Sequence, residues 1–104
     1  MTFEEYSERA WACAIYPNDD GVYPFLGLAG EAGEVCELKK KAIRDNEGLV
    51  SHDALVKELG DVLWYLNAIA REYAIDLEYI AEVNIEKLES RKQRGVLHGS
   101  GDNR

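Results

Sequence analysis

Two pairs of carboxylate side chains are the residues of this sequence best suited to chemistry: Glu31 with Glu34, and Glu58 with Asp61. Three residues separate the members of each pair, so on a helix each pair lies on one face. At about 100° per residue, Glu31 falls within the apolar stripe of its segment and Glu58 beside the stripe of the next. We therefore expect all four carboxylates to point toward the interior. Buried carboxylates cost several kcal/mol unless they are paired or bind a metal, so the pattern predicts a cation among them.

Four oxygen ligands from two neighbouring helices suit a hard divalent cation, and we expect Mg²⁺, with Mn²⁺ as the alternative. The only histidines are His52 and His98, and neither follows a glutamate by three residues. The Glu-x-x-His signature of di-iron helical bundles is therefore absent. A cation held mainly by carboxylates keeps several waters, which phosphate oxygens can replace.

A second group of polar side chains, Asn84, Lys87 and Arg91, lies on the apolar stripe of the last expected helix. Two interpretations remain open from spacing alone. Lys87 and Arg91 hold phosphate oxygens on the far side of a metal, with Asn84 orienting a phosphate or a sugar hydroxyl. Alternatively, the two bases form a structural salt-bridge network with the acids.

Composition limits the class of protein. The chain has 104 residues and a formal net charge of −8, which is the size of one domain and argues against nucleic acid as a generic partner. No apolar run is long enough to span a bilayer, and the acidic N-terminus lacks the apolar region of a signal peptide, so we expect a cytoplasmic protein. Cys13 and Cys36 show no metal-ligand spacing, and we expect buried reduced thiols.

The pattern of apolar residues predicts one all-α domain over residues 1–104. Residues 1–24 form an N-terminal helix, capped by Thr2 and ending near Tyr16, followed by a loop. Further helices are expected over about 26–44, 51–73 and 77–92, and residues 93–104 form a Gly-rich tail that is disordered by composition. We expect a helical hairpin core that forms a four-helix bundle and is completed by oligomerisation. The closely spaced glycines at 27, 30 and 33 suggest close approach by a helix or a ligand, while Tyr23 and Phe25 are either core anchors or a stacking platform for a base.

These motifs together resemble the MazG-like nucleoside triphosphate pyrophosphohydrolases of the all-α NTP pyrophosphatase superfamily. That superfamily's signature is E-E-x-x-E followed by E-x-x-D. Glu31 and Glu34 match its second and third acids, Gly30 stands at the first, and Glu58 and Asp61 match the second half. The segment from Asn84 to Arg91 resembles N-x-x-K-L-x-x-R, and residues 99–104, Gly-Ser-Gly-Asp-Asn-Arg, are similar to the C-terminus of short members.

The resemblance implies hydrolysis of a nucleoside triphosphate between its α- and β-phosphates, giving a monophosphate and pyrophosphate, as in nucleotide-pool sanitation. It assigns the catalytic metal to Glu31, Glu34, Glu58 and Asp61, and phosphate contacts to Lys87 and Arg91. Asn84 with Tyr65 or Trp64 would contact sugar or base, although Trp64 points away from the acids and suits an interface. The tail with Arg104 would fold over substrate, and a homodimer or homotetramer would complete the site. The alternatives are a phosphoribosyl-ATP pyrophosphohydrolase and a non-catalytic acidic helical interaction module.

Overall fold

The chain is built from four α-helices and has no strand, as the computed structural model of residues 1–104 shows. In chain order these are α1 (Phe3–Trp11), α2 (Tyr23–Asp45), α3 (His52–Glu72) and α4 (Leu77–Gln93). The predicted all-α class is confirmed. No helix is both long enough and apolar enough to cross a bilayer.

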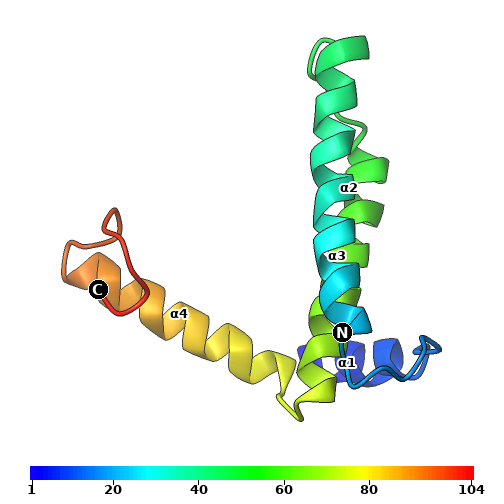
Figure 1. Ribbon diagram of the computed structural model, residues 1–104. Coiled ribbons are helices and arrows are strands. Elements are labelled where there is room, and N and C mark those ends of the chain that lie inside the picture. The colour runs from blue at the N-terminus through cyan, green and yellow to red at the C-terminus, as the bar shows by residue number, and fades with distance from the viewer.

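The core of the fold is a hairpin in which α2 and α3 run antiparallel and side by side (Figure 1). Gly48, with φ of +79°, makes the turn between them, and its N–H donates to the Ala42 carbonyl at 2.9 Å. The Ser51 hydroxyl then caps α3 by accepting from the Ala54 N–H at 3.4 Å. Residues that favour a helix stop and a helix start therefore set the hairpin. Both of its predicted helices are present, but α2 begins at Tyr23, three residues before its expected start, because Pro24 fits the first turn of a helix.

A short helix, α1, is fastened across one end of α3 by hydrogen bonds from three α3 side chains. Trp64 Nε1 donates to the Ala10 carbonyl at 3.1 Å and Asn67 Nδ2 to the Ser7 carbonyl at 3.2 Å, while Arg71 Nε donates to Ser7 Oγ at 2.9 Å. Spacings of three and four residues place these donors on one face of α3. The contact between α3 and α1 thus contains hydrogen-bonding polar groups, and two of the residues that supply them, Asn67 and Ser7, are buried.

The expected end of the first helix, near Tyr16, is wrong. The Thr2 cap is as predicted, with the Glu5 N–H donating to Thr2 Oγ1 at 3.1 Å, but α1 ends at Trp11. Tyr16 is held elsewhere: its ring stacks on Tyr23 with centroids 5.4 Å apart, and its hydroxyl donates to Glu72. Tertiary contacts of Tyr16 therefore override the local helical pattern.

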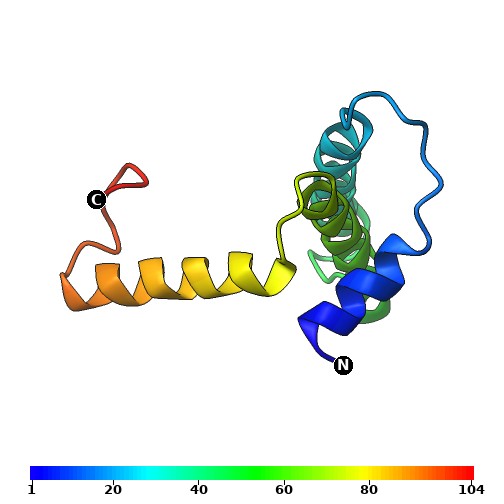
Figure 2. The same cartoon turned by 90° about the horizontal axis from the view of Figure 1, so that it is seen from below.

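The last helix, α4, turns away from the hairpin after a tight connection and contacts mainly α1 (Figures 1 and 2). Only its first residue Leu77 and its last-turn Arg91 are buried, and apolar side chains between them, including Val83 and Leu88, are exposed. One chain therefore supplies a hairpin with two attached helices. Assembly of a bundle with a second copy stays a prediction.

Two smaller expectations are wrong. Cys13 and Cys36 are unpaired but exposed rather than buried, because the hairpin covers only one face of α2 and the chain has left helix at Cys13. The tail is folded rather than disordered. Arg104 folds back and donates to the carbonyls of Val96 and Leu97, both at 2.9 Å, so side-chain hydrogen bonds replace the apolar packing that the tail's composition lacks.

Candidate metal centre

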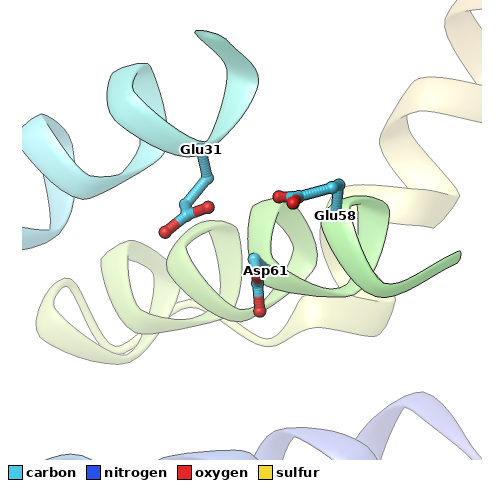
Figure 3. Close-up of side chains that lie close together, drawn as sticks. All are labelled: Glu31, Glu58 and Asp61. Carbon is cyan, nitrogen blue, oxygen red and sulfur yellow. The ribbon is translucent and has the colours of Figure 1, made fainter. Parts of the chain in front are cut away.

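Three of the four predicted acids lie close together where the two long helices adjoin (Figure 3). Glu31 projects from α2, while Glu58 and Asp61 project from α3. Each offers one carboxylate oxygen, and these three oxygens lie within 4.8 Å of one another. The spacing of three residues brings Glu58 and Asp61 to one side of α3, and the pairing of the hairpin helices brings Glu31 opposite them.

The fourth acid, Glu34, lies outside this cluster. Three residues turn a helix by about 300°, so about 60° separates Glu34 from Glu31. Glu31 consequently faces α3 and is half-buried, whereas Glu34 lies on the exposed flank of α2. Asp61 is also exposed, so the expectation that all four acids point inward is wrong for Glu34 and Asp61. Both remain close enough to act on Glu31 through their charge.

The cluster concentrates negative charge without a basic partner. Burial raises the pKa of Glu31 above its ordinary value, and the charges of Asp61, Glu58 and Glu34 raise it further. The ion pairs of the chain involve Glu37, Asp45 and Asp102 as their acids, and none involves a member of the cluster. Three closely spaced carboxylates with no countercharge in the chain are a donor set that fits a hard divalent cation, which would remove their repulsion.

An aromatic cleft lies one helical turn from the acids. Tyr65 follows Asp61 by one turn on α3, and its ring packs where Gly27, one turn before Glu31, carries no side chain. A Cβ at Gly27 would overlap that ring. The close approach predicted from the glycines is therefore confirmed at Gly27, whereas nothing lies within 4 Å of a Cβ built at Gly30 or Gly33.

The cleft has a volume of about 310 Å³ and is lined largely by apolar and aromatic side chains: Cys13, Ile15, Tyr16, Pro17, Tyr23, Trp64 and Tyr65. Trp64 stands edge-on to Tyr65, with ring centroids 5.1 Å apart. Burial raises the pKa of Tyr65, and the neighbouring Tyr23 and Glu31 raise it further, so its hydroxyl is protonated at neutral pH. Of the two aromatics expected to be core anchors or a stacking platform, Tyr23 lines this cleft, while Phe25 packs edge-on against Tyr73.

The predicted phosphate-binding residues lie elsewhere in the chain. Asn84, Lys87 and Arg91 are on α4, which extends away from the hairpin (Figure 2). Lys87 and Arg91 contact Asp102 of the tail, not the acids. The predicted salt bridges between these bases and Glu31 or Glu58 are therefore absent within one chain. Arg104 binds carbonyls of its own tail.

Sequence reasoning missed two features of these sites. Tyr16 was assigned to the first helix, and nothing local indicates that it reaches α2 and α3. Asp102 was not paired with Lys87 and Arg91, although it is the only acid in the tail. A lone acid in the tail that follows two basic residues on the last helix is a sequence signal for this ion pair.

The helical hairpin and its paired acids define a class, that of all-α proteins with a cluster of carboxylates where two helices adjoin. Residues 25–96 match the family described as the MazG nucleotide pyrophosphohydrolase domain. The chain is also 41% identical to the "Gene 37 protein" of Mycobacterium phage L5 over an alignment of 114 residues that covers the whole of both chains. No solved structure matches the chain. The chain belongs to the MazG nucleotide pyrophosphohydrolase family, whose enzymes act on nucleotides and depend on metal.

Proposed function

We propose that this protein hydrolyses nucleoside triphosphates at the α–β phosphate bond, releasing a nucleoside monophosphate and pyrophosphate, and serves nucleotide-pool sanitation in the cytoplasm. The observation that carries the proposal is the cluster of Glu31, Glu58 and Asp61, which lies where α2 and α3 adjoin and has no basic partner within the chain. A non-catalytic module would have been supported by ion pairs from Lys87 or Arg91 to these acids, and the chain forms none.

We assign the metal to Glu31, Glu58 and Asp61, with Glu34 on the adjoining flank, and Mg²⁺ as the ion. When bound, such a cation would neutralise triphosphate charge and polarise the phosphorus toward attack. Through that cation the carboxylates would hold the reacting end of the nucleotide in one place, and Glu34, exposed and outside the tight cluster, would orient the attacking water. Positioning and electrostatics supply most of the rate in this class of chemistry.

The aromatic cleft is the surface we assign to the base and sugar. Tyr65 connects it to the acids, because its ring lies one turn beyond Asp61 and against Gly27. A cleft of about 310 Å³ is at the lower end of the sizes that hold small ligands. Trp64 and Tyr23 offer ring faces and edges for a flat base, and stacking on such rings tolerates several bases.

We propose that a second copy of the chain completes the site by laying α4 along α2. Charge supports an antiparallel arrangement: α2 changes from acidic at Glu31 to basic at Lys40, and α4 changes from acidic at Glu82 to basic at Arg91. Nine residues separate the members of each pair. Placing Glu82 opposite Lys40 therefore brings Arg91 to the end of α2 that carries Glu31, where it would contact a phosphate oxygen beyond the metal and not the carboxylate itself. Exposed apolar side chains on both helices, such as Val83 and Ile43, would be covered in the same contact.

The test is a screen for pyrophosphate release with Mg²⁺ over standard, deoxy and oxidised nucleoside triphosphates, with phosphoribosyl-ATP as a separate arm. We expect Glu58→Gln to lower kcat at least about 100-fold, since even groups that only orient a metal ligand are worth 10- to 100-fold. Glu47→Gln, the same change in the exposed turn between α2 and α3, is the matched control. Wild-type turnover by Glu58→Gln would refute the metal assignment. Activity on phosphoribosyl-ATP alone would instead identify the protein as a phosphoribosyl-ATP pyrophosphohydrolase.

A further inference from the structure

A basic pair on α4 is occupied by a carboxylate of the same chain. Lys87 and Arg91 are four residues apart on α4 and therefore lie on one face. Lys87 Nζ lies 3.0 Å and Arg91 Nη2 3.1 Å from the same atom, Asp102 Oδ1. The two bases and the tail carboxylate thus form one three-membered cluster at the end of α4.

The carboxylate of Asp102 is the outer member of this cluster. The Arg91 side chain is 6% exposed and that of Lys87 36%, whereas the Asp102 side chain is 81% exposed. The Asp102 carboxylate therefore covers the basic pair from the solvent side, which is the side an incoming anion must use. Solvent screens ion pairs that have an exposed end such as this carboxylate, and screened pairs are typically worth less than about 1 kcal/mol.

The tail is held by contacts that do not need this carboxylate. Arg91 Nη2 also donates to the Asp102 main-chain carbonyl at 2.6 Å, and Arg94 Nη2 donates to the Arg104 carbonyl at 2.7 Å. Arg104 holds the Gly101 carbonyl at 2.6 Å, in addition to the carbonyls of Val96 and Leu97. The side chain of Asp102 can consequently leave the bases while the loop keeps its shape.

The buried guanidinium of Arg91 also has an unused donor. Its Nε is buried and has no hydrogen-bond partner. Asp102 uses only the Nη2 group, whereas a phosphate has enough oxygens to accept from Nε and Nη2 together. Buried donors in folded proteins are nearly always satisfied, so the unpartnered Nε marks a position that a multidentate anion would fill better than Asp102 does.

We propose that the Asp102 carboxylate is an internal stand-in for phosphate, which keeps Lys87 and Arg91 paired until a phosphate oxygen of the nucleotide displaces it. This inference rests on the proposed function for the identity of the anion. The carboxylate competes with substrate, so it weakens nucleotide binding and leaves the chemical step unchanged. Hydrogen bonds from Lys87 and Arg91 are the first cause of the lowered pKa of Asp102, so the pairing favours the charged form of the competitor.

The experiment compares steady-state pyrophosphate release by the full chain and its Asp102→Asn variant, with Mg²⁺ present. Because the carboxylate end of these ion pairs is exposed and screened by solvent, we expect KM to fall about two- to fivefold, with kcat within twofold of wild type. Asp102→Glu keeps the charge and should keep the wild-type KM. Glu89→Gln, on the exposed surface of α4, controls for a general loss of negative charge near the bases.

Each other outcome overturns the proposal. A rise in KM or a fall in kcat for Asp102→Asn would show that Asp102 positions Lys87 instead of competing with substrate. The same shift in Asp102→Glu would show that the loop conformation, and not the charge, is responsible. A shift no larger than that of Glu89→Gln would leave the carboxylate without a role.

Binding without turnover separates this inference from the proposed function. The probe is inorganic pyrophosphate with Mg²⁺, titrated into the wild type and Asp102→Asn while the amide signals of Gly99 and Gly101 are followed by NMR. If no triphosphate is hydrolysed, the proposed function fails, yet tighter pyrophosphate binding by Asp102→Asn would still support the stand-in. Pyrophosphate that moves neither amide in either protein would refute it.

Discussion

Replacement of Glu31 by glutamine tests whether the acids of the hairpin repel one another when no metal is bound. One oxygen of each acid lies within 4.8 Å of the others, and two like charges at that limiting separation repel by about 1 kcal/mol in water and by about 3.5 kcal/mol at an effective dielectric constant of 20. The lower figure applies to a half-exposed acid, because solvent screens it. Glu31 faces two such neighbours, Glu58 and Asp61, so Glu31→Gln should stabilise the metal-free protein by about 1–2 kcal/mol, which corresponds to roughly 4–8 °C in Tm per kcal/mol for a chain of this size.

The same substitution should weaken the response to Mg²⁺. A cation that binds only the folded wild type at a concentration 100 times its Kd adds about 2.7 kcal/mol, and Glu31→Gln removes one ligand. The assay is thermal unfolding at one fixed protein concentration, with EDTA and with Mg²⁺, and Glu47→Gln as the matched control. If Glu31→Gln lowers Tm in EDTA, or gains as much from Mg²⁺ as the wild type does, the repulsive metal centre is refuted.

The pH dependence of this effect has a definite sign. The pKa of Glu31 is raised in the folded chain, by burial first and then by neighbouring acids. The folded state therefore holds this proton more tightly than the unfolded state does. The contribution to stability is present below the unfolded pKa, about 4.3, and is lost as pH rises through the folded value. Glu31→Gln should accordingly stabilise the metal-free protein at pH 7 and lose that advantage near pH 4.

Three further outcomes are expected. Gly27→Ala should destabilise the chain by about 1–3 kcal/mol in urea unfolding, because its Cβ would overlap the Tyr65 ring. Gly33→Ala has open space around its Cβ and should stabilise the chain by about 0.5–1 kcal/mol. Equal changes in stability for the two variants would contradict the packing of Gly27 against Tyr65. In an NMR titration from pH 7 to 2, the carboxyl carbon of Asp102 should titrate below its ordinary pKa of about 4. The stabilisation from its contacts with Lys87 and Arg91 should be present above that ordinary pKa and be lost as pH falls through the lowered pKa of the folded chain. Val83→Asp should shift sedimentation equilibrium toward monomer and reduce pyrophosphate release together; loss of only one would separate self-association from the site.

The sequence by itself determined the local features of this protein. Spacing of three residues placed Glu58 and Asp61 on one side of a helix, and cap residues such as Thr2 and Ser51 marked where helices begin. These features follow from backbone geometry within one or two turns, which a pattern of residue types describes directly. The motifs that indicated a metal-dependent enzyme of the MazG family are of the same local kind.

Tertiary structure alone decided which of these residues meet. The pairing of α2 with α3 selected Glu31 for the cluster and left Glu34 on the flank, although both have the same spacing pattern. Tyr16 reaches the hairpin only because the chain leaves helix at Trp11 and folds back. Asp102 meets Lys87 and Arg91 only because arginines bind main-chain carbonyls of the tail. Contacts between separate segments depend on rotation and offset of whole elements, which the free energy of the complete chain sets and no short pattern encodes.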